Sequence, residues 1–288
     1  MRIKDLFLKL TNPKAYQSGM ELLAELKKDN ADAQKVKALV DQGAALRLTD
    51  PEGAPDAPML AVLHDRADLL QLMIDKNIDL NRRYPSVNVI FGNINSNSLL
   101  DWSIASRPAC AKLLIENGAD INQTRPGNYT FLMEAAYRSY NKDSLALAHL
   151  MIARGATVWE RDDKGFTALH HAARGGYDGL VAALLDKDAE LIDMVDKNDE
   201  TPLMKLFKHP YVANTNYQPH LDLEKDLAKV VVLLIARGAD LHVKNKQGKT
   251  ALDLARANNH NEIAIMIEAG IAAQFGKNKP SGPAKPGM

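Results

Sequence analysis

The sequence lacks several features on which particular protein classes depend. It has one cysteine, Cys110, in 288 residues, and only 6% of its residues are aromatic. A single cysteine cannot form an intramolecular disulfide or supply a thiolate metal cluster. The simplest interpretation of Cys110 is that it is a small core residue. No apolar run approaches the roughly 18 residues of a membrane-spanning helix, and the charged N-terminal stretch is unlike a secretion signal. We therefore expect a cytoplasmic protein that does not enter a membrane, with secretion by a non-classical route left open.

An excess of either charge is also missing. The chain has 36 Lys and Arg and 36 Asp and Glu, so its formal net charge is zero at pH 7. Dedicated nucleic-acid binders draw much of their affinity from surplus basic residues, so we expect no nucleic-acid partner. Hydrophobic residues make up 46% of the chain and charged residues 25%, which is typical of a folded soluble protein.

What the sequence does contain is an internal repeat. The string LLIENGADIN at 113–122 returns as LMIARGATVW at 150–159 and as LLIARGADLH at 233–242. A threonine-led segment (TFLMEAA, TALHHAA, TALDLAR) begins 12 residues after the glycine of each copy. Two landmarks in constant phase indicate a repeated structural unit.

Each repeat predicts a pair of short helices. The threonine is an N-cap candidate for a first helix, such as 167–174, and a glycine turn then leads to a second helix, such as 178–187. The second helix ends at Gly or Asn, residues that accept a left-handed C-cap, and a polar tight turn follows. One such pair cannot bury its apolar faces alone, whereas stacked copies can, so the pattern predicts a solenoid.

This pattern resembles the ankyrin repeat, in which a β-turn precedes two antiparallel helices. The segment GATVWERDDKGFTALHHAARGGYDGLVAALL at 155–185 is close to the complete repeat, and weaker similarity extends from about residue 33 to 270. The resemblance implies an all-α ankyrin-repeat solenoid with short hairpin connectors, comprising six full or partial repeats and a helical N-terminal cap. It implies protein recognition and no chemistry, so we expect no enzyme.

We divide the chain into three segments. Residues 1–43 are expected to form the capping unit, with helices over 14–30 and 33–43. Residues 44–270 are expected to form the repeat array. Residues 271–288 end in a Gly-, Pro- and Lys-rich stretch that predicts a disordered tail.

Two insertions interrupt the repeat pattern, near 85–95 and near 208–223. The first contains the apolar letters VNVIF, and it is either a tolerated surface insertion or a binding segment. The second is either a contact loop or a lid over the helix ends. The alternative to a recognition protein is an enzyme, or a protein that binds a small ligand or a metal, with a site built from these loops.

Histidines are the other candidates for chemistry. His170 and His171 are adjacent on a helix and so face different directions, which is a poor arrangement for chelation. His170 occupies the place of the histidine in the family's Thr-Pro-Leu-His motif, which implies hydrogen bonding within the hairpin and the helix start. His209 and His220 lie in the second insertion without tight ligand spacing. We therefore predict no catalytic, metal or cofactor-binding residue and no cofactor.

We expect the interaction surface at the turn tips and on the exposed inner face of the first helices, the concave side of the array. In the ankyrin pattern these positions vary, and aromatic and arginine side chains are typical interface anchors. The candidate partner-binding residues are Tyr129, Arg138, Trp159, Arg161, Asp163, Lys164, Phe166, Arg174, Lys197, Glu200, Lys208, Lys246 and Lys249.

Within this set, Lys164, Phe166 and Arg174 belong to one repeat and are expected to line one face, with no capping, turn or core role. The predicted function is non-enzymatic binding of a protein partner, as a scaffold or as an inhibitor of that partner. We expect the chain to be monomeric.

Overall fold

The computed structural model describes residues 8–48, 55–84, 98–139, 141–208 and 223–277. The chain divides into two compact units, Met1–Pro126 and Gly127–Met288, which we call unit 1 and unit 2. In its described part the regular structure is helical except for two short strands, β1 (Thr124–Arg125) and β2 (Tyr129–Thr130). The predicted all-α fold is confirmed.

The described part of unit 1 contains a short helical segment at residues 8–11, followed by three helix pairs. First and second helices alternate along the chain, and α2, α4 and α6 pack on one another in order, as do α3, α5 and α7. Leucines such as Leu23, Leu69 and Leu114 are buried between them. The helices are α2 (Pro13–Leu26), α3 (Ala33–Asp41), α4 (Ala57–Leu63), α5 (Ala67–Ile74), α6 (Leu99–Ile104) and α7 (Pro108–Glu116).

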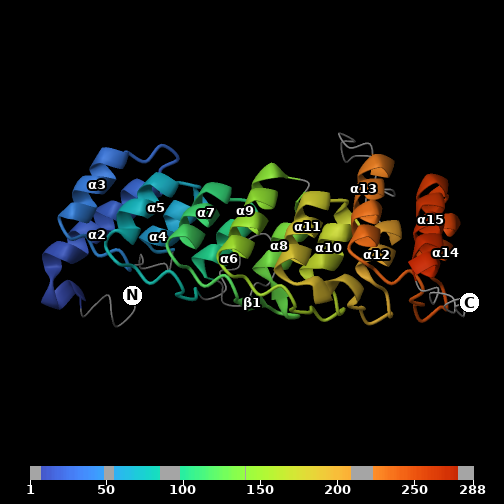
Figure 1. Ribbon diagram of the computed structural model, residues 1–288. Helices are drawn as coiled ribbons and strands as arrows, with labels where there is room; N and C mark the ends of the chain where they lie inside the picture. Colours follow the sequence, from blue (N-terminus) through green and yellow to red (C-terminus); the bar gives the residue numbers. More distant parts are fainter. Residues whose placement is uncertain (1–7, 49–54, 85–97, 140, 209–222, 278–288) are drawn as a thin grey trace, which may run out of the picture. The chain divides into compact units, whose positions relative to one another are not determined.

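Unit 2 continues the same plan. Figure 1 shows its second helices α9, α11, α13 and α15 as one row and its first helices α8, α10, α12 and α14 as another, and neighbours within each row are in contact. The first helices are α8 (Phe131–Tyr137), α10 (Ala168–Gly175), α12 (Pro202–Lys205) and α14 (Ala251–Ala257). The second are α9 (Lys142–Ala153), α11 (Asp178–Lys187), α13 (Leu223–Ala236) and α15 (Asn261–Lys277), and 3-10 turns cover Ala189–Asp193 and Leu206–Lys208.

The sequence landmarks have the expected structural roles. In unit 2, Thr201 Oγ1 accepts the N–H of Met204 at 3.4 Å, and Thr250 Oγ1 accepts the N–H of Asp253 at 3.2 Å. The glycines that end the second helices have φ angles of 84° to 91°, a left-handed conformation that costs glycine little. The N-cap threonines are Thr130, Thr167, Thr201 and Thr250, and the glycines are Gly43, Gly118, Gly155 and Gly238.

The ends of the chain show one agreement and one difference. The N-terminal helix pair is present as α2 and α3. At the other end, α15 continues to Lys277, beyond residue 271, where the sequence places the start of the tail. The extension packs within unit 2 on the segment before α14, since Gln274 Nε2 donates to Ala239 O at 2.9 Å. The predicted tail from 278 onward, the first insertion, and the second insertion apart from residues 208 and 223 lie outside the described residues.

Candidate functional site

The hairpin turns of unit 2 are built on one repeated hydrogen-bond pattern. Asp162 Oδ1 accepts the backbone N–H groups of Lys164 and Phe166, both at 2.8 Å. Asp196 and Asn245 accept the equivalent pair of N–H groups in the next two hairpins. Sequence reasoning missed these three residues, although each lies five positions before an N-cap threonine. Their side chains fix the shape of each turn.

The tips are also bonded to one another. The backbone N–H of Asp163, Lys197 or Lys246 donates to a carbonyl in the preceding turn, at 2.8 to 3.0 Å. The approach at Gly165 is so close that a Cβ there would lie 2.9 Å from the backbone nitrogen of Lys197. The hairpins of unit 2 therefore form a continuous ladder, which fixes the backbone positions from which their exposed side chains project.

The predicted partner-binding residues differ in exposure. Their exposed members are Trp159, Arg161, Asp163, Lys164, Lys197, Lys246 and Lys249. Their half-buried members are Tyr129, Arg138, Phe166 and Arg174. Glu200 is buried, and the side chain of Lys208 lies outside the described residues.

Glu200 is a correction to the predicted surface, because only 1% of it is exposed. Lys205 Nζ lies 2.5 Å from Glu200 Oε2 and 2.5 Å from Asp196 Oδ2, and Asn245 Nδ2 donates to Glu200 Oε1 at 3.2 Å. Burial by itself would raise the pKa of Asp196, but the Lys205 ammonium and two backbone N–H groups hold that pKa below its ordinary value. Glu200 is drawn inward because the buried Lys205 requires anionic partners.

Phe166 also differs from the prediction. The sequence analysis gave it no core role, whereas its ring packs against buried neighbours. The ring stacks on His170, with centroids 5.6 Å apart and planes 15° from parallel. Lys205 Nζ lies 4.4 Å from the Phe166 centroid, within the range of a cation–π contact. Phe166 therefore covers the buried charge cluster and is not a free anchor.

His170 has the role that the family resemblance implies. Its Nδ1 accepts the N–H of Thr167 at 3.1 Å, so Nε2 carries the proton and donates to Glu200 O at 3.2 Å. Burial lowers the pKa of His170 from 6.5 to about 4, and the ring is neutral near pH 7. Because both nitrogens are bonded, this side chain is a link between two hairpins and has no free ligand atom for a metal.

His171 faces an aromatic cluster instead. Its ring lies edge-on to Tyr129 and Tyr137, at centroid distances of 5.6 and 6.0 Å, and 5.4 Å from the ring of Phe166. Nε2 is 3.6 Å from Asp162 Oδ2, and only 7% of the residue is exposed. Tyr137 is 39% exposed and joins the surface, although sequence reasoning did not select it.

The two half-buried arginines already take part in interactions. Arg138 forms an ion pair with Glu134, a mostly buried carboxylate one turn earlier on α8. Arg174 also takes part in an interaction. Neither arginine is as available to a partner as the exposed lysines of the turns.

Trp159 is exposed for a reason that can be traced to its position in the repeat. In the next repeat, Asp193 occupies this position and its Oδ1 accepts the N–H of Asp240 at 3.0 Å. In unit 1, Asn81 makes the same bond to Asp120 at 2.8 Å. Tryptophan has no acceptor for such a bond, and Trp159 is 54% exposed.

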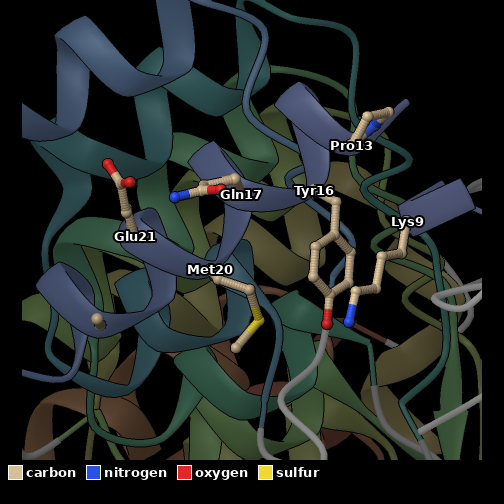
Figure 2. Close-up of a pocket in the computed structure, with 7 residues that line it drawn as sticks. Lys9, Pro13, Tyr16, Gln17, Met20 and Glu21 are labelled. Carbon is tan, nitrogen blue, oxygen red and sulfur yellow. The ribbon is translucent and has the colours of Figure 1, made fainter.

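A pocket of about 400 Å³ lies elsewhere, on α2 of unit 1 (Figure 2). Tyr16, Gln17 and Met20 line it, and Lys9 Nζ lies 5.7 Å from the centre of the Tyr16 ring. Among the described residues that line it, none is a serine, cysteine or histidine, and Glu21 is the one carboxylate. These described residues do not pair a nucleophile with a base.

The other residues considered for catalysis or metal binding are Cys110, His209 and His220. Cys110 is completely buried, and burial raises the pKa of its thiol to about 12, as expected of a core residue. In the described part of the chain, no His, Cys, Asp and Glu side chains gather as a group of three around a possible metal, and no helix there could span a membrane. His209 and His220 lie outside the described residues.

A family model of ankyrin repeats, in three copies, matches residues 22–125 and 132–214. The chain belongs to the ankyrin repeat family. Ankyrin repeats are a general protein–protein interaction module, whose stacked units present an extended binding surface.

Named relatives share parts of this ankyrin chain. It is 29% identical over 169 residues to the putative ankyrin repeat protein YahD of Escherichia coli, a match that covers 58% of this chain and 77% of the relative. It is 28% identical over 139 residues to human ankyrin repeat domain-containing protein 53, covering 47% of this chain and 22% of the relative. A Caenorhabditis elegans homolog of a transient receptor potential channel is 26% identical over 53% of this chain, which spans 14% of that protein.

A solved structure supports the fold. The crystal structure of an ankyrin repeat domain from Acinetobacter baumannii matches with a TM-score of 0.59 and 20% identity. The match covers 74% of this chain and 96% of that domain. The predicted ankyrin solenoid architecture is confirmed.

Proposed function

We propose that this ankyrin chain is a non-enzymatic recognition module that binds a protein partner through the hairpins and first helices of unit 2, as a scaffold or as an inhibitor of that partner. The hydrogen-bonded ladder of hairpin tips is the observation that carries the proposal. A surface that is already ordered loses little conformational entropy on binding, so its exposed side chains contribute more of their interaction energy to affinity.

The exposed side chains available for contact are of two kinds. Lys164, Lys197 and Lys246 each stand on a different turn of the ladder. Trp159 lies in the arm of the first of these hairpins and lacks the inter-repeat bond of its counterparts. Tryptophan is strongly enriched among residues that dominate interface energies, so we assign it as an anchor.

The test is affinity capture from a lysate of the source organism, with mass spectrometry to identify what binds. The variants are Lys164→Ala, Lys197→Ala and Lys246→Ala combined, and separately Trp159→Ala. The matched control combines Lys142→Ala, Lys187→Ala and Lys225→Ala, which removes the same charge from exposed positions on the second helices.

Interface anchors typically contribute 2 kcal/mol or more, which is about thirtyfold in affinity. We therefore expect the hairpin triple variant and Trp159→Ala to lose the captured partner, while the control retains it and all melting temperatures stay close to that of the parent. Loss of the partner by the control, with capture intact in the hairpin variants, would contradict the proposal.

A further inference from the structure

The hairpins of unit 2 have a local surplus of positive charge, although the whole chain is neutral. The turn segments 161–166, 195–200 and 244–249 hold only two fully exposed acids, Asp163 and Asp199. Their exposed basic residues are Arg161, Lys164, Lys197, Lys244, Lys246 and Lys249. The exposed charge of these turns is therefore mostly positive.

The other carboxylates of these turns do not neutralise the lysines. Asp162 and Asp196 hold the turn backbones, and Glu200 is buried against Lys205. In the part of the chain that the structure describes, Lys164, Lys197, Lys246 and Lys249 have no carboxylate within ion-pair distance. Their ammonium groups are left to solvent or to a partner.

The ladder also sets a spacing. Successive tips are joined by backbone hydrogen bonds. Each tip precedes a first helix, and neighbouring helices pack about 8–10 Å apart, so successive tips have a similar spacing. A peptide in the extended polyproline II conformation has three residues per turn and rises about 3.1 Å per residue, so every third side chain returns to the same face after about 9 Å and meets the next tip. We propose that the partner segment bound here is an extended acidic stretch of protein with a carboxylate at about every third residue. This inference rests on the proposed function and specifies the chemistry of the partner.

A protein segment fits this surface better than a nucleic acid does. Single-stranded nucleic acids stack their bases on exposed aromatic faces between basic side chains. The aromatic ring within these turns, Phe166, has its faces occupied by Lys205 and stacked His170.

The experiment measures fluorescence anisotropy of labelled peptides on the full chain at low salt. One peptide repeats Glu-Ser-Gly four times, a second repeats Gln-Ser-Gly, and a third has the composition of the first with its glutamates adjacent. An oligothymidine of similar length is the nucleic-acid probe. The chain variants combine Lys197→Glu, Lys246→Glu and Lys249→Glu, or Lys142→Glu, Lys187→Glu and Lys225→Glu as a control of equal net charge.

We expect the spaced glutamate peptide to bind at least tenfold more tightly than either other peptide, and added salt to weaken it. The hairpin variant should lose at least tenfold in affinity and the control should not. Tighter binding of the oligothymidine, or equal binding of the three peptides, would overturn the inference.

A further outcome separates this inference from the proposed function. If none of the peptides binds while capture of a protein partner still depends on the hairpin lysines, the inference of an acidic partner segment is wrong and the proposed function stands. If capture of the protein partner does not depend on those lysines, the proposed function itself is wrong.

Discussion

At the scale of the residue, Phe166 shows how a side chain on a hairpin can be part of the core. Its ring covers Lys205 and stacks on His170. Phe166→Ala should lower the free energy of unfolding by about 1–3 kcal/mol, since it removes packing and a cation–π contact from a half-buried site. Lys164→Ala, two residues away and exposed, should change it by less than ~0.5 kcal/mol. Urea unfolding of both variants measures the difference, and equal effects would contradict the packing role.

His170 predicts a pH dependence of stability. Its pKa falls from 6.5 to about 4 in the folded chain because of burial. Between these values the unfolded chain binds the proton and the folded chain does not, so unfolding becomes easier as pH falls. The stabilisation is complete above pH 6.5 and is lost progressively down to pH 4.

The measurement is urea unfolding at intervals between pH 7.5 and 4, on the parent and on His170→Gln. The variant should be less stable at high pH and should show a shallower fall through this window, because the titrating ring is gone. Parallel pH profiles for the two proteins would show that His170 does not cause the dependence.

At the scale of the element, the contact between neighbouring hairpins can be separated from turn conformation. Gly165 and Gly248 both have left-handed φ angles, of 82° and 71°. A Cβ on Gly165 would collide with the backbone at Lys197, whereas nothing lies within 4 Å of a Cβ on Gly248. Gly248→Ala should cost about 1–2 kcal/mol for the backbone conformation alone, and Gly165→Ala clearly more. Thermal unfolding compares them, and equal losses would mean that the hairpins do not constrain one another.

At the scale of the whole molecule, stability within unit 2 should depend on position along the stack. Leu169 is buried on α10, which packs between α8 and α12, whereas Leu254 lies on α14, in the last helix pair. Leu169→Ala should cost about 2–5 kcal/mol and reduce amide protection from α8 through α12 together. Leu254→Ala should reduce protection mainly in α14 and α15. Hydrogen exchange followed by mass spectrometry tests this, and identical patterns would contradict nearest-neighbour coupling.

Much of the architecture could be predicted from the sequence because the residues that cap, turn and pack each repeat lie close together in the chain. Thr167 caps the helix it precedes, and Gly155 ends the one it follows. The stripe of Leu180, Val181, Leu184 and Leu185 is buried as its helical spacing predicts. These assignments depend on residues a few positions apart, and hence on the backbone chemistry of one repeat.

The surface required the tertiary structure, because it depends on contacts between repeats. Glu200 and Phe166 both lie next to a cap threonine and looked equally free, yet both are drawn toward Lys205 on α12. Trp159, Lys197 and Lys246 remained exposed. A buried ammonium must find counter-charges and a ring face from whichever neighbours the stack supplies, and no spacing within one repeat specifies those neighbours. The sequence by itself therefore determined the helix pairs and their order. Only the stacking of one hairpin on the next decided which side chains are left for a partner.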